Sequence, residues 1–501
     1  MLLALDVGTT HCKAGLFRED GELIRAATRP MVARRAASGY SYFDPGELLG
    51  LVSQVAREAV GEERKVDCIG IASMAESGLL VDRRSGEPRS PILPWFDTSA
   101  GKQAESLLNR FGPLDLFSRI GIHLSYKASL AKILWLQKNQ RVIADGATWL
   151  SAADYIAYRL TGEMGTDYSL STRTGAFRID SRTWDTDLLR TLTLEPDLFP
   201  SARIGGAVLG PVNIHSAHIL GVAAGTPVAV AGHDHVCASL GVGAIQPGLV
   251  FDSMGTAEAL CGVRPRVPLG EREFRSGLVF GCHLLPGTDY WMGGLSSSGG
   301  SVEWLRRILG EPALDYGQVT ALLETASEGP GDILYFPYLL GNKSRAPRSN
   351  AQGALIGLRD THSRADLALA VLEGTAYEME TIRLSAQALD TAPITHLIAA
   401  GGGTRLGRWL QIKADVSGCE ITVPNASEAT LLGAALAAGA GAGIYPDARE
   451  AVKKSARPAS AVFRPDPDRH AAYCRIFENE YSTWQNLINR EKSGAANDAS
   501  S

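Results

Sequence analysis

After Met1 the chain reads Leu2-Leu3-Ala4-Leu5-Asp6-Val7-Gly8-Thr9-Thr10. An apolar run ends in a carboxylate, a glycine and two hydroxyls, and a second apolar run follows from Cys12 to Phe17. This pattern predicts a strand, a tight turn and a returning strand. The glycine lets the main chain approach a ligand, and the threonine N–H and O–H groups can donate to phosphate oxygens. The aspartate could hold a cation through water. An ordinary β-hairpin with a capping aspartate explains the same residues, and the short motif alone does not decide.

The composition limits the class of protein. With 501 residues the chain is long enough for about three average domains or two large lobes. Hydrophobic residues make up 45% and charged residues 21%, which is typical of a globular protein rather than a disordered one. The net charge of −5 gives no support to a nucleic-acid partner or to a basic membrane-surface patch.

The seven cysteines are scattered and none forms a CxxC pair, so the sequence indicates neither a zinc site nor a disulfide framework. No apolar run reaches about 18 residues, and no basic segment with an apolar signal core stands at the N-terminus. We therefore expect no membrane span and a cytoplasmic location.

Polar residues follow the next predicted strand. A helical stripe over 47–60 precedes the buried strand Val66–Ser73, and the carboxylate of Glu76 comes just after that strand. This order indicates an α/β layer with ligands at the strand ends. Further on, Trp95 and Asp97 suit a sugar site, because apolar ring faces need an aromatic surface and hydroxyls need an acceptor. A surface turn with a packed Trp is the commoner explanation of such a pair.

A second strand end carries an aspartate. The buried stretch 226–232 stops at a glycine and presents Asp234 between His233 and His235, before a helical run of small residues. An aspartate at the start of a helix is often only a cap. A helix cap, however, does not require that a strand ending in glycine comes just before it.

The stretch Leu249-Val250-Phe251-Asp252-Ser253-Met254-Gly255-Thr256 echoes the opening of the chain about half its length away. Such internal similarity predicts two lobes of related fold, each presenting a phosphate-binding hairpin. Gln246-Pro247-Gly248 is a natural boundary, so we expect lobes at 1–245 and 246–490. The tail 491–501 is rich in Ser, Ala and Asn, which predicts disorder.

Two glycine-rich stretches in the second half resemble nucleotide-binding loops. The stretch 290–300, which includes Ser298, predicts a glycine- and serine-rich loop before a helix over 302–309. A main chain so free of side chains can approach a nucleotide or phosphate, or is merely flexible. A strand over 395–400 runs into Gly401-Gly402-Gly403, where a flat ring can lie against the main chain.

Together these motifs resemble the FGGY carbohydrate kinases, the sugar-kinase branch of the actin-like ATPase superfamily. The match spans nearly the whole chain in family order, so the combination is specific although each motif alone is weak. The motifs that carry it are Leu5–Thr10, Ala231–Asp234, Ser253–Thr256, Ala400–Gly403, Tyr335–Leu339, Leu372–Ala376, Trp409–Asp415 and Glu428–Ala435.

The resemblance implies an α/β fold of two ribonuclease-H-like lobes with a central ligand cleft, the sugar mostly in the first lobe and ATP mostly in the second. It implies an enzyme that phosphorylates a hydroxyl of a ketose, sugar acid or polyol with ATP and Mg²⁺, and a homodimer. Asp234 stands at the family's catalytic base, and Asp6, with Asp234, near its Mg²⁺. The other positions carried over are Glu76, Trp95 and Asp97 for sugar, Gly8, Thr9, Thr10, Gly255, Thr256 and Ser298 for phosphate, and Gly401 and Gly402 for adenosine.

Some positions depart from the family pattern. Many relatives have an Arg where this chain has Ser99, and a Gly-Glu-Arg where it has Gly341-Asn342-Lys343. Glu76 stands where xylulokinases carry a His and glycerol kinases a Glu. No named sugar follows from these residues. His233 and His235 either tune the neighbouring aspartate or are simply packed or solvated.

Two other functions remain as alternatives. One is a catalytically weak sugar sensor, because of the departures from the family pattern. The other is a sugar-independent actin-like ATPase. The presence of both Asp6 and Asp234 argues against the sensor, and the Trp95–Asp97 pair argues against the sugar-independent ATPase.

Overall fold

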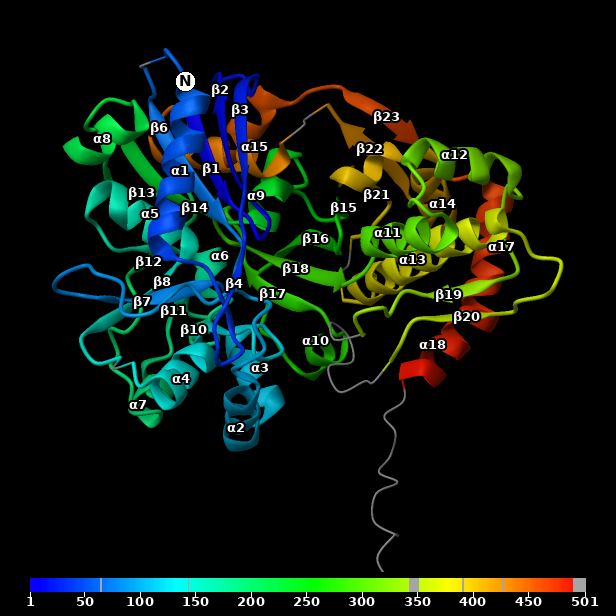
Figure 1. Ribbon diagram of the computed structural model, residues 1–501, viewed down its shortest axis with the longest axis horizontal. Coiled ribbons are helices and arrows are strands. Elements are labelled where there is room, and N and C mark those ends of the chain that lie inside the picture. Colours follow the sequence, from blue (N-terminus) through cyan, green and yellow to red (C-terminus); the bar gives the residue numbers. More distant parts are fainter. Residues whose placement is uncertain (64, 143, 342–350, 390–391, 426–427, 490–501) are drawn as a thin grey trace, which may run out of the picture.

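The computed structural model describes residues 1–63, 65–142, 144–341, 351–389, 392–425 and 428–489. Two large mixed β-sheets form the centres of two lobes (Figure 1). Asn342, Lys343 and the tail 491–501 lie outside the described residues, so the expectations for them stay predictions.

The first sheet is built around the opening strand. β1 (Leu2–Val7) pairs antiparallel with β2 (His11–Phe17) and parallel with β6 (Cys68–Ser73). The tight turn forms as predicted, with Gly8 N donating to the carbonyl of His11 at 3.0 Å. The strand order is β13-β14-β6-β1-β2-β3, completed by β3 (Leu23–Pro30), β13 (Val208–Pro211) and β14 (Pro227–His233).

The second sheet repeats this arrangement. β15 (Leu249–Met254) pairs antiparallel with β16 (Glu258–Pro265) and parallel with β21 (His396–Ala400), as β1 pairs with β2 and β6. The duplication predicted from the sequence echo is therefore present in the topology. The order is β17-β18-β16-β15-β21-β22-β23, with β17 (Val279–Cys282), β18 (Thr288–Leu295), β22 (Glu420–Pro424) and β23 (Ala459–Phe463).

The two echoing strands have the same burial pattern from their second residue on, and in both the fifth residue is partly exposed. That residue is Asp6 in β1 and Ser253 in β15. Asp252 stands one position earlier, and because side chains alternate between the faces of a strand, it points to the opposite face. It is completely buried. The two aspartates are therefore not structurally equivalent.

Helices cover both faces of the first sheet. Leu3 and Leu5 belong to the core that contains α1 (Pro45–Val60) and α5 (Ala152–Thr161). Leu2 and Ala4, on the alternate face, belong to the core that contains α9 (Asp234–Gly241) and α15 (Ala429–Gly441). α15 comes from the C-terminal half of the chain, yet it packs on β1, β6 and β14.

The remaining first-half elements surround this lobe (Figure 1). A short sheet pairs β7 (Gly78–Asp82) with β8 (Ala147–Ser151). The other helices are α2 (Gly101–Phe111), α3 (Pro113–Ile120), α4 (Ser129–Gln140), α6 (Tyr168–Ser171), α7 (Thr186–Thr191) and α8 (Ile214–Leu220). The other short strands are β4 (Arg34–Arg35), β5 (Ser41–Tyr42), β9 (Thr166–Asp167), β10 (Phe177–Arg178), β11 (Thr183–Trp184) and β12 (Ala202–Arg203).

In the second half, the predicted glycine-rich loop 290–300 is mostly strand β18. Tyr290 and Trp291 are buried, and Gly293 leaves room for Ile382, whose Cγ2 would lie 2.5 Å from an added Cβ. Gly293 therefore serves packing against a helix. The helices here are α10 (Glu271–Arg275), α11 (Gly299–Leu309), α12 (Tyr316–Thr325), α13 (Arg364–Gln387), α14 (Gly407–Ser417), α16 (Ala448–Ser455), α17 (Pro467–Ile476) and α18 (Ser482–Asn489), with strands β19 (Leu334–Phe336) and β20 (Ala354–Ile356).

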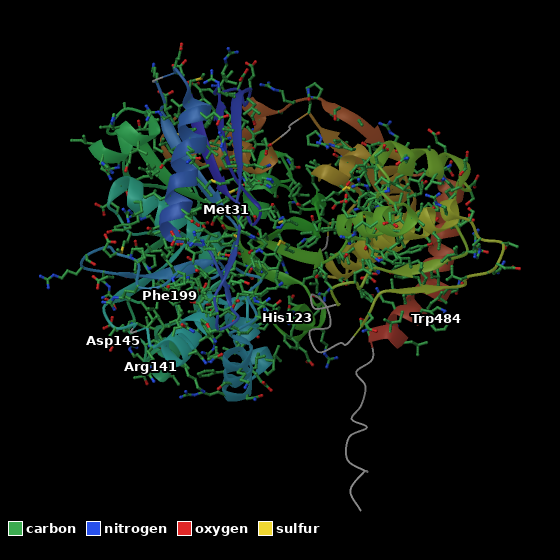
Figure 2. The ribbon with its side chains drawn as sticks, in the orientation of Figure 1. Met31, His123, Arg141, Asp145, Phe199 and Trp484 are labelled. Carbon is green, nitrogen blue, oxygen red and sulfur yellow. The ribbon has the colours of Figure 1, made fainter. Side chains whose placement is uncertain are left out.

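The two halves are in direct contact. The ring of His123, labelled in Figure 2, lies 5.0 Å from that of Phe274 in α10, and Phe280 N donates to the carbonyl of Gly121 at 2.7 Å. In the part of the chain that the structure describes, no helix is long and apolar enough to cross a membrane. All seven cysteines are described, and each is a free thiol.

Candidate active site

Three parallel strands bring three carboxylates to one edge of the first sheet. β1, β6 and β14 lie side by side, and their carboxyl ends lead to Asp6, Glu76 and Asp234. At this edge Gly232 has φ 137°, and an added Cβ would lie 2.5 Å from Ser169 Oγ. The glycine before the aspartate is thus required by the backbone and by the space around it.

Asp234 is the first residue of α9, and His233 occupies the N-cap position without a side-chain cap bond. Asp234 Oδ1 accepts from His235 N at 2.6 Å and lies 3.1 Å from His233 Nε2. Burial would raise the pKa of Asp234, but His235 and the His233 hydrogen bond outweigh it and lower the pKa to about 2. The carboxylate is therefore ionised at neutral pH.

The surroundings of Asp6 raise its pKa, whereas those of Asp234 lower the pKa of Asp234. Burial, and then the charge of Asp234, raise the pKa of Asp6 to about 8, although Lys13 lowers it. Among the described residues, Asp6 Oδ1 is buried without a hydrogen-bond partner. A buried oxygen acceptor beside a second carboxylate suits a hard cation. Lys13 in turn binds Glu428 at 2.8 Å and so joins β2 to the residue before α15.

Glu76 adopts φ 58°, a left-handed conformation that is uncommon for a residue other than glycine. Such strain is often found at functional sites. Its Oε1 accepts from Arg173 Nη2 at 2.5 Å. Burial opposes ionisation of Glu76, but Arg173, Lys127 and His233 outweigh burial and lower its pKa. Glu76 is therefore a charged acceptor held among cations.

The sequence interpretation missed Arg173. Its Nε and Nη1 atoms are buried and have no hydrogen-bond partner in the described parts of the chain, so two donors remain for a ligand oxygen. One signal was available, because Arg173 is the only charged residue between Tyr168 and Phe177. Charged side chains are rarely buried unless they are paired.

Trp95 lies beside the opening hairpin. Its Nε1 donates to Thr9 Oγ1 at 2.8 Å, and Lys127 Nζ lies 5.2 Å from the centre of its ring. Asp97 is 5% exposed and accepts main-chain N–H groups from Ser41 at 2.6 Å and Ser99 at 3.1 Å. The Asp97 carboxylate therefore fixes the loop that carries the Trp.

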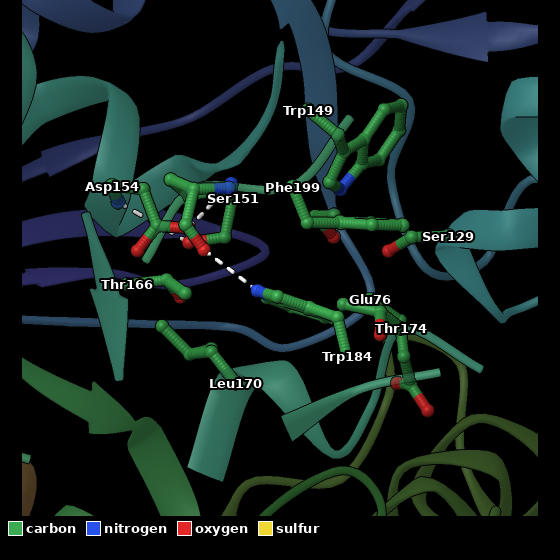
Figure 3. Close-up of a pocket in the computed structure, with 12 residues that line it drawn as sticks. Glu76, Ser129, Trp149, Ser151, Asp154, Thr166, Leu170, Thr174, Trp184 and Phe199 are labelled. Atoms are coloured by element: carbon green, nitrogen blue, oxygen red, sulfur yellow. Dashed lines mark hydrogen bonds between the residues drawn. The ribbon is translucent and has the colours of Figure 1, made fainter. Parts of the chain in front are cut away.

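Lys132 is hydrogen-bonded to the same loop and so helps to fix its position. Its Nζ donates to the carbonyls of Glu76 and Pro94, at 2.5 and 2.8 Å. Behind Glu76 lies a cavity of about 10 Å³, the volume of one water and too small for a sugar. Figure 3 shows this cavity, which is lined by Glu76, Ser77, Ser129, Trp149, Ser151, Asp154, Thr166, Leu170, Thr174, Trp184, Phe199 and Pro200.

In the second lobe, the turn between β15 and β16 meets the start of α11. Ser298 N donates to the carbonyl of Thr256 at 3.1 Å, and Gly299 N to that of Gly255 at 3.2 Å. Gly401 has φ 114°, and an added Cβ would lie 2.5 Å from Met254 O. The predicted phosphate turn, Ser298 and the triple-glycine turn are therefore neighbours.

Ser298, one of the residues predicted to bind phosphate, cannot reach a ligand with its side chain. The Ser298 side chain is completely buried, and its Oγ donates to Glu258 Oε2 at 2.5 Å. Gly402 is different, since an added Cβ would meet no described atom within 4 Å. Open space beside the glycine turn leaves room for a flat ring.

Comparison with known proteins agrees with this geometry. The N-terminal domain of the FGGY family of carbohydrate kinases matches residues 1–241, and the C-terminal domain of the same family matches residues 273–442. The chain is 28% identical to the glycerol kinase of Gloeobacter violaceus, over 98% of this chain and 97% of the relative. It is 25% identical to the xylulose kinase of Bacillus subtilis, over 95% of each.

Solved structures share the fold along nearly the whole chain. The xylulose kinase from Rhodospirillum rubrum superposes with a TM-score of 0.86 and 26% identity, covering 98% of this chain and 100% of that one. The gluconate kinase from Lactobacillus acidophilus gives a TM-score of 0.89 at 22% identity, covering 98% and 99%. At 22% identity, the similarity to the gluconate kinase is evidence of a shared fold only.

Proposed function

Because the chain belongs to the FGGY family of carbohydrate kinases, we propose that it transfers a phosphoryl group from Mg²⁺-ATP to a hydroxyl of a small ketose, sugar acid or polyol, with Asp234 as general base. The observation that carries this proposal is the ionised, partly exposed carboxylate of Asp234 at the strand edge shared with Asp6 and Glu76. ATP-dependent phosphorylation of a sugar or polyol is the activity of the family.

A sugar hydroxyl is a weak nucleophile, so its proton must be accepted as the bond to phosphorus forms. Asp234 is held in the ionised form needed for this step by His233 and His235. Proton transfer to a positioned base contributes about 10²- to 10⁴-fold to the rate. The remaining catalysis of phosphoryl transfer comes from positioning and from neutralising charge.

The unpaired Asp6 Oδ1, with Asp234 nearby, fits a Mg²⁺ ion that accompanies the nucleotide. When bound, such an ion neutralises charge on the transferred phosphoryl group. The protein adds the N–H and O–H donors of Thr9 and Thr10 in the first turn, where Gly8 lets the main chain approach, and the main chain of the second turn, Gly255-Thr256. The open space at Gly402 suits the adenosine ring.

The acceptor substrate would lie between Glu76 and Trp95. Glu76 offers a charged acceptor for hydroxyls, Arg173 offers donors for substrate oxygens, and Trp95 offers an apolar ring face. This set holds a polyhydroxylated molecule without fixing which one. A homodimer and a cytoplasmic location, both expected from the sequence, are also part of this proposal.

The test is a panel of ketoses, polyols and aldonic acids screened for coupled ADP release. We expect Asp234→Asn to lower kcat on the best acceptor by about 10²- to 10⁴-fold, with ATP affinity within twofold of wild type. Asp187→Asn is the control, because Asp187 is an 88% exposed carboxylate on α7. Full turnover by Asp234→Asn would refute the base assignment. ADP release independent of every acceptor would favour a sugar-independent ATPase instead.

A further inference from the structure

A cluster of buried charges lies beneath the second phosphate turn. Lys413 Nζ lies 3.1 Å from Asp252 Oδ2 and 2.5 Å from Glu258 Oε1, and Ser298 Oγ donates to Glu258 Oε2 at 2.5 Å. Lys413, Asp252 and Ser298 are completely buried, and Glu258 is 3% exposed. None of these side chains faces the proposed substrates.

The cluster connects the segments that carry the predicted nucleotide contacts. Asp252 and Glu258 lie on the two strands of the hairpin, on either side of Gly255 and Thr256. Ser298 precedes α11, whose first main-chain N–H groups donate to the carbonyls of that turn. Lys413 lies in α14, which follows the triple-glycine turn packed on Met254. A change at Lys413 would therefore reach all three segments.

The charges in the cluster do not balance, because two carboxylates face one ammonium group. Asp252 Oδ1 is buried and has no hydrogen-bond partner among the described residues. Burial, and then Glu258, raise the pKa of Asp252 against the opposing effect of Lys413. The same two carboxylates raise the pKa of Lys413 against burial. The excess of carboxylates over ammonium groups thus favours an added proton in the cluster.

Stability alone is a weak explanation for such a cluster. Buried ion pairs replaced by apolar residues of similar volume often cost little or nothing. An unsatisfied buried carboxylate oxygen adds a further cost. A role in holding the nucleotide segments would explain why the charges lie here.

We propose that Lys413 is a positioning residue for ATP. Through Glu258 and Ser298 it holds the start of α11 against the Gly255–Thr256 turn, so that the turn keeps one fixed shape toward the phosphate oxygens. The inference rests on the proposed function, because it assumes that this turn receives the ATP phosphates. It predicts an effect on ATP and none on the acceptor.

The test compares Lys413→Met and Asp252→Asn with wild type. For Lys413→Met we expect ATP affinity, measured by calorimetry without acceptor, to weaken about tenfold, while the acceptor KM at saturating ATP stays within twofold. Asp252→Asn keeps the Lys413–Glu258 pair and balances its charge. We expect it to keep ATP affinity within twofold of wild type. Lys453→Met, a 71% exposed lysine paired with Glu450, is the control and should change neither quantity.

Two results would overturn the inference. One is a Lys413→Met protein that is less stable but binds ATP as wild type does, since the cluster would then be only structural. The other is an Asp252→Asn protein that folds and keeps Lys413 and Glu258 yet loses ATP affinity about tenfold, which decides the matter even if Lys413→Met does not fold. If wild type itself bound no ATP, the proposed function would fail as well. Normal ATP binding by wild type and Lys413→Met alike would refute this inference alone.

Discussion

Replacing Gly433 by Ala tests whether the contact between α9 and α15 sets the position of Asp234. An ideal Cβ on Gly433 would lie 1.7 Å from the carbonyl oxygen of Cys237, and real Cβ contacts are essentially never under 3.0 Å. The two helices must therefore separate by at least about 1.3 Å. Cys237 is one helical turn after Asp234, so we expect the Asp234 carboxylate to move with it.

The expected magnitude has two parts. Overpacking of this kind costs about 1–3 kcal/mol of unfolding free energy. A displacement of about 1 Å in an active site can lower the rate about 10²-fold. Gly50→Ala is a matched control, because Gly50 lies on the exposed face of α1 and an added Cβ meets nothing within 4 Å. It should gain about 0.5–1 kcal/mol from helix propensity and keep full activity.

Urea unfolding and steady-state kinetics on the best acceptor measure both parts. The difference in unfolding free energy between Gly433→Ala and Gly50→Ala isolates the packing cost, since both variants gain the same propensity. A Gly433→Ala protein as stable as Gly50→Ala, with kcat within twofold of wild type, would show that the helices can part without moving the site.

Three further predictions concern single side chains. Burial lowers the pKa of His283 to about 3, whereas the unfolded chain binds this proton near pH 6.5. The contribution of neutral His283 to the free energy of unfolding is therefore complete above pH 6.5. Below that pH the free energy of unfolding falls by up to about 1.36 kcal/mol per pH unit. Urea unfolding at pH 7.5 and 5.0 should show a smaller loss for His283→Gln, and an equal loss would contradict this. Trp95→Leu should raise the acceptor KM about tenfold through the lost ring face, whereas Trp95→Phe should raise it less; equal KM values for both would exclude a stacking role. Arg173→Met should cost about 3–5 kcal/mol by leaving Glu76 unpaired, and adding Glu76→Gln should recover most of this in urea unfolding; no recovery would mean that the charge is not the cause.

Much of the fold could be predicted because its signals are local. The apolar run, glycine and threonines of the first hairpin, and their echo at 249–256, predicted both sheet centres. Strand β18 was missed for a local reason too, since its glycines are typical of a loop. One of them, Gly293, makes room for Ile382, which follows about 90 residues later in the chain.

The parts of the site that were missed depend on distant partners. Arg173 meets Glu76 across 97 positions of sequence, and Lys413 meets Asp252 across 161. No periodicity or short motif records such pairs. Asp234 could be predicted because a strand end, a glycine and a helix start mark its position within a few residues.

The position of α15 late in the sequence also affects how the chain folds during synthesis. The face of the first sheet formed by Leu2 and Ala4 is covered by α9 and α15, so part of it stays open to solvent until residues 429–441 have left the ribosome. During that interval a nascent chain exposes an apolar surface that aggregation or a chaperone can reach. A fragment that ends at the predicted boundary after residue 245 would keep this surface exposed permanently. Expressing the first lobe alone should therefore require α15, supplied either by fusion or as a separate peptide.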